Sequence, residues 1–421
     1  MRRLAAVDAQ TYWMSAKIPS DQFLLYGFSG LPADLHRELR VLRERAVACP
    51  DLGLRVDDRG PLTYPAWVTR GVGDDQFVIH ELDEPSWPGC LAAVGALANR
   101  QLDAREMVWR LHVFTPVDAI PGMTAPGTVA VLQVAHVLAD GQRSSALAAW
   151  LFGRQAPVTP VPPPPPFRTA ALPMRAVRAA RGHRRLEADT AAGAVPPQAV
   201  SRPVLTTNNR PDGVRTIRTL VRRRGELPGP TVTVGVLAAV GGALSAHLRG
   251  LGDDPAALGA EVPMARAGAP RAHNNFGNVG VGLHPELDAA ERAERIAAEL
   301  ASRRQRARHP GMVTASRAFA ALPAPLLRWG VAQFDPTLRS TSATGNTVVS
   351  SVYRGAADLA FGGAPVVVTA GFPALSPMMG LTHGVHGIGD TIAISVHAAA
   401  CAIGGIDGLD AYLHRLAEAL R

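Results

Sequence analysis

The segment Thr128–Gly153, "TVAVLQVAHVLADGQRSSALAAWLFG", decides the fold, because it predicts a buried strand, a tight loop and a helix in direct succession. Thr128 to Val134 is almost entirely apolar, which is typical of a strand buried on both faces. Gln142 to Phe152 places its large apolar residues on one helical face and is followed by a glycine stop. We therefore expect His136 at a strand end, in a loop that Gly141 allows to bend, where rigid scaffolds commonly hold catalytic side chains.

This loop carries a His-x-x-x-Asp-Gly motif, formed by His136, Asp140 and Gly141. A neutral imidazole at such a place can accept a proton from an alcohol or an amine, and a positioned general base contributes about 10²–10⁴ in rate. The motif alone equally fits a strand-end histidine bonded to the backbone and an aspartate that caps the following helix. We interpret Asp140 as a structural brace of the loop, paired with Arg266 from the second half of the chain.

Composition restricts the class of protein. The chain has 421 residues with 47% hydrophobic and 19% charged content, as a folded protein of two or three domains has. The formal charge of +8 comes from arginine, with Lys17 as the only lysine, and is weak evidence for a polyanionic partner. The three cysteines are far apart and suggest neither a disulfide framework nor a clustered metal site. The beginning of the chain has no continuous apolar run, so we expect no secretory signal and a cytoplasmic protein.

Several other classes of function are disfavoured by the sequence. Thr231 to Leu248 is the most apolar stretch, but glycines and polar residues interrupt it, so it predicts a buried helix instead of a membrane span. Aromatic residues make up 5% of the chain and do not alternate with basic ones, which argues against a nucleic-acid platform. No Gly-x-Ser-x-Gly motif of a serine hydrolase is present. His383 and His386 have no third clustered ligand, so we predict no metal site.

A proline-rich segment divides the chain. Residues 156–200 contain "APVTPVPPPPPFRTAALP" and "AAGAVPPQAVSRP", which predict extended linker chain. We therefore predict an N-terminal lobe at 1–155, a crossover linker at 156–200 and a C-terminal lobe at 201–421. In both halves strands and helices occur without strict alternation, which favours α+β layers over a doubly wound sheet.

The linker also contains a basic helix, since Arg175, Arg178 and Arg181 recur every third residue with apolar residues between them. Its arginines fit either a solvated helix face or a contact with lipid headgroups or phosphates. The other predicted elements are helices at Leu35–Cys49, Leu287–Arg308 and Leu322–Phe334, an antiparallel hairpin of Met107–Phe114 with Thr128–Val134, a strand at Thr216–Val221 and a glycine-rich loop at Asn274–Leu283.

"AHVLADG" resembles the His-His-x-x-x-Asp-Gly motif of the wax ester synthase/diacylglycerol acyltransferase (WS/DGAT) family, within the CoA-dependent acyltransferase superfamily that includes chloramphenicol acetyltransferase and condensation domains. Further segments resemble family elements in the same order along the chain. These are "DQFLLYG" from Asp21, "CPDLGLRV" from Cys49, "LDAREMVW" from Leu102, "VPMAR" from Val262, "FGNVGVGL" from Phe276 and "VVSSVYRG" from Val348. Because the order holds over almost all of the chain outside the linker, the resemblance is more specific than any one segment.

The resemblance implies two chloramphenicol-acetyltransferase-like lobes joined by the crossover linker, with His136 in a tunnel between them. It implies direct transfer of an acyl group, long-chain in this family, from acyl-CoA as co-substrate to an alcohol such as diacylglycerol or a fatty alcohol, without a permanently bound cofactor. His136 would take the hydroxyl proton.

The residues expected at the site are His136 and Asp140 as catalytic residues, and Gly141, Arg266, Asn278, Ser350 and Ser351 as substrate-binding residues. Asn278 and the two serines suit stabilisation of an oxyanion, and equally suit bonding to the backbone of a loop or strand edge. Expected partners are acyl-CoA, a hydroxylated acceptor and, through the basic helix, an anionic membrane or lipid droplet, with no nucleic acid.

Three places depart from the family pattern. Ala135 stands where the family has its first histidine, Thr233-Val234 where Asn-Asp is expected, and Tyr353-Arg354-Gly355 where Pro-Gly-Pro is expected. His136 aligns with the second histidine, the one assigned as base, so the chemistry is retained. The departures leave an alternative open: a degenerate or carrier-protein-dependent member of the same fold, which forms esters or amides in lipid or polyketide metabolism or binds lipid without turnover. A carrier-protein donor predicts no activity with free acyl-CoA.

Overall fold

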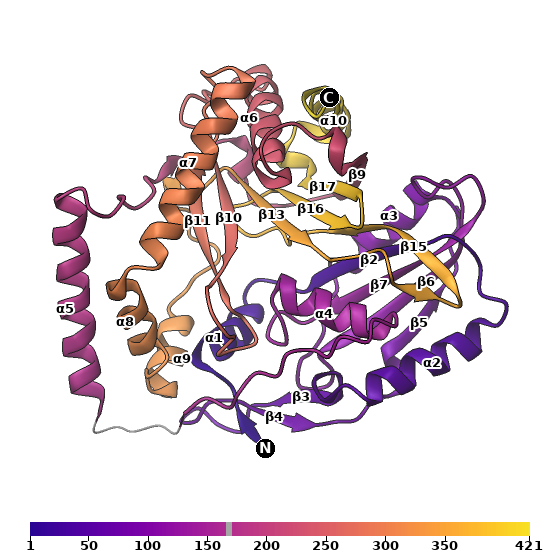
Figure 1. Ribbon diagram of the computed structural model, residues 1–421, viewed down its shortest axis with the longest axis horizontal. Coiled ribbons are helices and arrows are strands. Elements are labelled where there is room, and N and C mark those ends of the chain that lie inside the picture. Colours follow the sequence, from indigo (N-terminus) through magenta and orange to yellow (C-terminus); the bar gives the residue numbers. More distant parts are fainter. Residues whose placement is uncertain (166–170) are drawn as a thin grey trace.

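Two mixed sheets form the framework of the structure, a computed structural model that describes residues 1–165 and 171–421 (Figure 1). The first sheet consists, in spatial order, of β14 (Ala360–Phe361), β15 (Ala364–Gly371), β2 (Gln22–Phe28), β7 (Gly127–Val134), β6 (Trp109–Val117) and β5 (Phe77–His80). The second consists of β11 (Phe276–Gly282), β10 (Gly259–Ala265), β13 (Thr347–Tyr353), β16 (Leu381–Ile388), β17 (Thr391–Ala399) and β9 (Arg215–Arg223). Smaller sheets pair β1 (Arg2–Arg3), β4 (Ala66–Thr69) and β3 (Leu54–Asp57), and β12 (Ser342–Ala343) with β8 (Arg202–Pro203).

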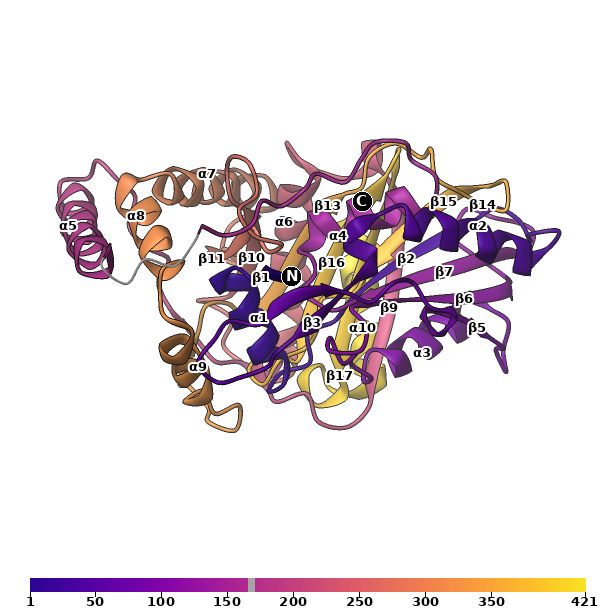
Figure 2. The same cartoon turned by 90° about the horizontal axis from the view of Figure 1, so that it is seen from below.

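Helices cover both sheets (Figures 1 and 2). Their bounds are α1 (Ala6–Ser15), α2 (Leu35–Val47), α3 (Trp87–Leu97), α4 (Gly141–Leu151), α5 (Leu172–Ala191), α6 (Val232–Gly250), α7 (Ala289–Ala307), α8 (Pro310–Phe319), α9 (Ala324–Ala332) and α10 (Gly405–Ala419). Apolar residues of α1, α2, α4 and α9 form one core with the first sheet, and residues of α6, α7 and α10 form another with the second. This two-lobed α+β organisation confirms the predicted fold class.

The lobes are joined through main-chain pairing. Strand β15, which comes from the C-terminal part of the chain, pairs antiparallel with β2 and extends the first sheet. A further core, under α3, brings Ile217 and Ala393 of the second sheet against residues of the first. The lobe and linker boundaries at 155/156 and 200/201 stay predictions, and residues 166–170 of the predicted linker lie outside the described residues.

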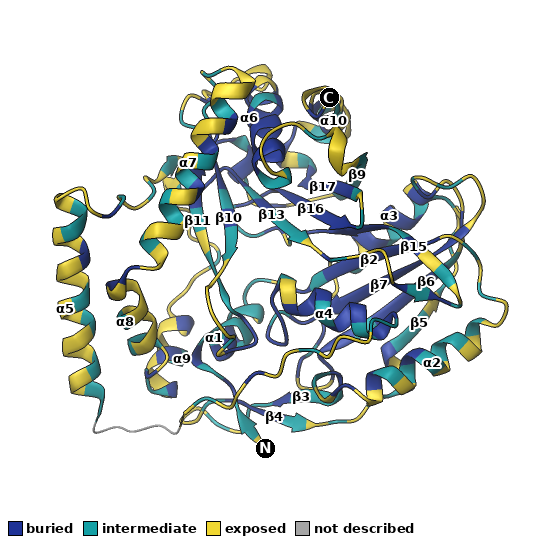
Figure 3. Ribbon diagram, viewed as in Figure 1, coloured by how far each residue is buried: buried dark blue, intermediate teal, exposed yellow. Residues whose placement is uncertain are grey.

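The strand, loop and helix around His136 form as the apolar pattern predicts. Every residue of β7 is buried, and β7 pairs antiparallel with β6 in the predicted hairpin. Helix α4 begins at Gly141, with Asp140 as its N-cap, and presents most of its length to the interior. Figure 3 shows β7 and α4 as largely buried elements. Because β7 is buried on both faces, the loop at its end is fixed in position.

The predicted glycine-rich loop at Asn274–Leu283 is wrong in its larger part. Residues Phe276–Gly282 form β11, which pairs with β10 over seven residues. Its glycines allow close packing at the sheet edge: a Cβ at Gly280 would lie 2.9 Å from the carbonyl oxygen of Thr344. The glycines therefore mark close approach of backbone to backbone, which glycine permits in strands as well as in loops.

Two long helices, α6 and α5, correspond to the apolar stretch and the basic helix that the sequence predicts. Helix α6 is long and apolar enough to span a membrane by length and composition, and most of its residues are buried in the core of the second lobe. Helix α5 is the predicted basic helix; it packs along α8 at one edge of the molecule and has only Leu186 fully buried (Figures 1 and 3). Its other faces are free to meet solvent.

Candidate active site

His136 lies in the turn directly after β7 and is half-buried. Its Nδ1 is fully buried without a hydrogen-bond partner among the described residues, whereas Nε2 keeps contact with solvent. The imidazole stacks on the ring of Phe276, with the ring centroids 5.6 Å apart. Burial lowers the pKa of His136, although its own backbone and Asn274 act in the opposite direction. The imidazole is therefore neutral at pH 7 and has one nitrogen accessible to a reactant.

Asp140 braces the loop, but not through the predicted partner. One carboxylate oxygen accepts from the backbone N–H of Arg143, at 2.9 Å, and caps α4; the other accepts from the backbone N–H of Asn275, also at 2.9 Å. Arg266 instead donates to the carbonyl of Phe276 and the hydroxyl of Ser316. The predicted Asp140–Arg266 pair is thus wrong, because the guanidinium of Arg266 is held by Phe276 and Ser316 instead. The role of Asp140 as N-cap and brace agrees with the sequence analysis.

A short segment from the C-terminal half, His273–Asn275, holds the His136 loop; we call it the strap. It leads into β11, and in Figure 1 the β10–β11 hairpin reaches toward α1 and α4. The side-chain amide of Asn274 donates to the carbonyl of His136 at 2.8 Å, and Nδ1 of His273 lies 2.7 Å from the carbonyl oxygen of Leu138. The N–H of Asp140 donates to the carbonyl of His273 at 3.2 Å. The loop conformation thus depends on residues more than 130 positions away in the sequence.

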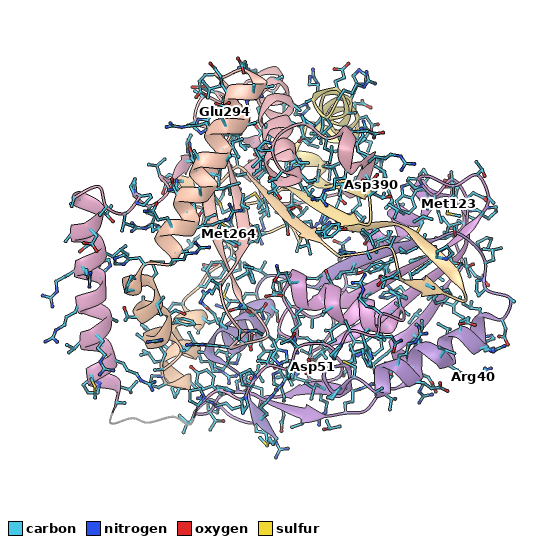
Figure 4. All side chains as sticks on the ribbon, viewed as in Figure 1. Arg40, Asp51, Met123, Met264, Glu294 and Asp390 are labelled. Carbon is cyan, nitrogen blue, oxygen red and sulfur yellow. The ribbon has the colours of Figure 1, made fainter. Side chains whose placement is uncertain are left out.

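The first turn of α4 is anchored by a buried ion pair. Arg143 binds Asp51, which lies below α4 in Figure 4, and also donates to the carbonyl of Thr159 at 2.7 Å. Both side chains are almost fully shielded from solvent. Because breaking such a pair leaves an uncompensated buried charge, it strongly constrains where α4 begins.

Strand β13 faces the loop from the second lobe. A Cβ added at Gly141 would lie 3.2 Å from Cγ2 of Val352, so this glycine permits close contact between α4 and β13. Since alternate residues of a strand share a face, Ser350 lies on the same face as Val352, toward the loop. Ser351 lies on the opposite face and accepts a hydrogen bond from the hydroxyl of Thr233 at 2.9 Å.

The remaining predicted site residue, Asn278, lies in β11 two residues after Phe276, whose ring stacks on His136. It is exposed on the edge strand β11, and its side-chain amide donates to Glu261 of β10. The structure therefore brings together His136, Asp140, Gly141 and the face of β13 that carries Ser350, and it bonds the side chain of Asn278 to Glu261. The substrate-binding roles of Gly141, Arg266, Asn278, Ser350 and Ser351 stay predictions.

Three polar residues of this cluster were missed by the sequence analysis: Asp8, His273 and Asn274. Their side chains make hydrogen bonds with partners between 135 and 271 positions away, so local periodicity and motif spacing carry no signal for them. His383 and His386, in turn, are buried in β16; His383 is bonded to Thr347 and Tyr412. Over residues 1–165 and 171–421, no group of three potential metal ligands is found.

Two adjoining cavities lie near Lys17 and Gln101. One, of about 170 Å³, is lined among others by Asp21, Arg215 and His397, and the other, of about 620 Å³, lies between α1, α9 and the segment 101–105. Both include Lys17 and Gln101, so they adjoin each other. His136 lines neither of them, and its predicted place in a tunnel between the lobes stays a prediction.

Comparison with solved structures agrees with this architecture over the whole chain. The wax ester synthase/diacylglycerol acyltransferase from Marinobacter aquaeolei VT8 is similar at a TM-score of 0.62 and 19% identity, covering 99% of this chain and 98% of that one. The starter condensation domain of rhizomide synthetase RzmA, in a structure with C8-CoA, is similar at 0.59 and 14% identity, covering 99% and 93%. A structure of that domain with C8-CoA and Leu-SNAC gives 0.58 and 14%, with the same coverage. No curated protein matches the chain by sequence.

The two-lobed fold, with a His-x-x-x-Asp-Gly loop at the end of a buried strand, is the fold that these solved structures share. A family model matches the C-terminal part of the chain: residues 273–420 match the WS/DGAT C-terminal domain, and the matched segment begins at the strap residue His273. The resemblance to the WS/DGAT family stated from the sequence motifs is confirmed.

Proposed function

We propose that this protein transfers an acyl group from acyl-CoA to the hydroxyl of an alcohol acceptor, with His136 as general base. The observation that supports this most is the state of His136, whose Nε2 is accessible, whose lowered pKa keeps it neutral, and whose loop is held from both lobes. A base of this kind must be unprotonated and fixed in position at working pH. Diacylglycerol and fatty alcohols are the acceptors that the family resemblance favours.

The proposed reaction needs no covalent enzyme intermediate. Nε2 of His136 takes the acceptor proton while the hydroxyl oxygen attacks the thioester carbonyl carbon. The carbon–sulfur bond of the tetrahedral intermediate then breaks, and the imidazolium returns the proton to the departing CoA sulfur. Ser350 is the hydroxyl best placed to donate to the oxyanion, because it shares a strand face with Val352, which packs against the start of α4.

Release of CoA tests this proposal. Purified protein would be incubated with long-chain acyl-CoA and a panel of fatty alcohol, diacylglycerol, sterol and sugar acceptors, and free thiol would be followed. We expect acceptor-dependent release that falls by at least about 10² in His136→Ala, since a general base contributes about that much. His414→Ala, which changes an exposed histidine on α10, serves as the matched control. Equal rates in wild type and His136→Ala with every acceptor would show that the assignment of the base is wrong.

A carrier-protein donor is the second candidate, which the departures from the family motifs leave open. Thr233 stands at one of these departures, and its hydroxyl donates to Ser351 of β13. Acyl groups loaded on a carrier protein should then be consumed where acyl-CoA is not. Turnover of free acyl-CoA at a comparable rate would exclude an obligatory carrier.

Membrane contact through α5 is part of the proposed function. Its outward side carries Arg178, Arg181 and Arg184 beside Met174 and Val177, whose side chains are about half exposed. Arginines around exposed apolar residues suit the headgroup region of an anionic bilayer, where acceptors of low solubility reside. A helix at one edge of the molecule can meet such a surface without displacing the core.

A further inference from the structure

Asp8 is a buried carboxylate that contacts the strap but not His136. It lies in the first turn of α1 and is 1% exposed. Its oxygens accept from the backbone N–H of His273 at 3.0 Å, from the backbone N–H of Asn274 at 2.9 Å and from the side-chain amide of Asn274 at 3.1 Å. Three converging donors make the ionised carboxylate the best acceptor for this place. One side chain of α1 thereby fixes two consecutive residues of the C-terminal half.

The same strap residues hold the His136 loop. Asn274 uses its side-chain amide twice, toward Asp8 and toward the carbonyl of His136. The N–H of Asn275 binds Asp140, and His273 meets the loop through its ring and its carbonyl. Asp8 is therefore one hydrogen-bonded residue away from the backbone of His136.

The protonation state of His273 follows from its partners. Nδ1 faces the carbonyl of Leu138, which can only accept, so Nδ1 carries the hydrogen. Nε2 then accepts from Arg2 at 2.9 Å. Burial lowers the pKa of His273 to about 4, so this ring stays neutral and does not act as a counter-ion for Asp8. The charged groups that face Asp8 are Arg143 from α4 and, beyond His273, Arg2.

We propose that Asp8 is a positioning residue of this active site: through the strap, its carboxylate fixes the backbone conformation from which His136 acts. The inference rests on the proposed function for its catalytic consequence, and on the hydrogen bonds alone for its structural one. Burial, opposed by the three hydrogen bonds, raises the pKa of Asp8 to about 6, so the carboxylate loses its charge in mildly acidic solution. One oxygen of Asp8 would then be a hydroxyl, which is a weaker acceptor for the N–H groups of His273 and Asn274.

Hydrogen exchange tests the structural step without any substrate. In Asp8→Asn, an amide nitrogen replaces one of the accepting oxygens, and we expect the amides of residues 136–140 to exchange at least about tenfold faster than in wild type. Asp21→Asn is the matched control, since Asp21 is also buried with a pKa raised to about 6, but binds Leu102 and Gln133 and not the strap. Unchanged protection of the loop in Asp8→Asn, or the same loss in Asp21→Asn, would overturn the proposal.

Kinetics test the catalytic step. For folded Asp8→Asn we expect kcat to fall about tenfold or more with KM within about twofold, because misplacing a catalytic group reduces rate more than binding. In a His136→Ala background the same change should have no further effect, and with Asn274→Ala it should be non-additive. An equal loss in the His136→Ala background, or a change confined to KM, would contradict a role through His136. If wild type releases no CoA with any acceptor, the proposed function fails, while hydrogen exchange still decides whether Asp8 fixes the loop.

Discussion

The carboxylate of Asp140 and the backbone N–H of Asn275 are joined at 2.9 Å, and this bond connects the start of α4 in one lobe with the approach to β11 in the other. The second oxygen of Asp140 caps its own helix. One side chain thus performs a local task, which is visible in the motif, and a long-range task, which is not.

Replacement of Asp140 should lower the free energy of unfolding by more than the loss of a helix cap alone. Loss of an N-cap typically costs about 0.5–2 kcal/mol, and Asp140→Ala would also leave the N–H of Asn275 without its acceptor. We expect denaturant unfolding to show a larger loss for Asp140→Ala than for Asp288→Ala, because Asp288 caps α7 through bonds within its own helix only. Equal losses would mean that the bond between the lobes adds nothing to stability.

The rate of the reaction should depend on pH as expected for a base that is neutral at pH 7. Since burial lowers the pKa of His136 below its ordinary 6.5, the imidazole is unprotonated at pH 7 and the rate should be lost only as the pH falls through that lowered pKa. A pH profile of kcat/KM from pH 4 to 8 would check this. An acid limb centred above pH 7 would contradict the environment described for His136.

Asp8 should make the free energy of unfolding depend on pH. Its pKa in the folded state, about 6, lies above the ordinary 3.8, so the folded protein binds this proton more tightly than the unfolded chain does. The stability that this group contributes is full below about pH 4 and is lost as the pH rises through about 6. The free energy of unfolding of wild type relative to Asp8→Asn should therefore decrease between pH 4 and pH 7. A difference that is constant over this range would exclude a raised pKa.

The two serines of β13 should differ. Ser350 shares a strand face with Val352, which contacts the start of α4, whereas Ser351 is bonded to Thr233 on the other side. We expect Ser350→Ala to lower kcat by about 10²–10³ if its hydroxyl stabilises the oxyanion, and Ser351→Ala to change kcat much less. Rates of CoA release would decide, and a larger effect at Ser351 would reverse the assignment.

Membrane binding should depend on α5. Changing the outward arginines Arg178, Arg181 and Arg184 to serine should weaken co-sedimentation with phosphatidylserine-containing vesicles at low salt by up to about 10²-fold, since each arginine near an anionic surface contributes about 1 kcal/mol. The matched control changes three other exposed arginines, Arg295 and Arg304 of α7 and its C-cap residue Arg308, and removes the same charge. If both triple variants lose binding equally, only net charge matters and α5 is not the contact.

The order of residues along the chain was enough to predict the local elements and the resemblance to the WS/DGAT family. The apolar run Thr128–Val134 can only be buried, and Asp140-Gly141 after it provides a helix cap and a bend, so strand, loop and helix follow from adjacent residues. The glycines of β11 were misread because close packing and turns both require glycine, and residues near in sequence do not distinguish the two.

The contacts that hold His136 in place become visible only in the folded protein. The partners of its loop come from Asp8 of α1 and from the strap, which are more than 260 residues apart in sequence, and polar side chains such as theirs show no periodicity. The same is true of the difference between Ser350 and Ser351, which depends on which face of β13 meets α4. Hydrogen bonds of this kind are specified by the position of donor and acceptor in three dimensions, and that position exists only after the two sheets have packed.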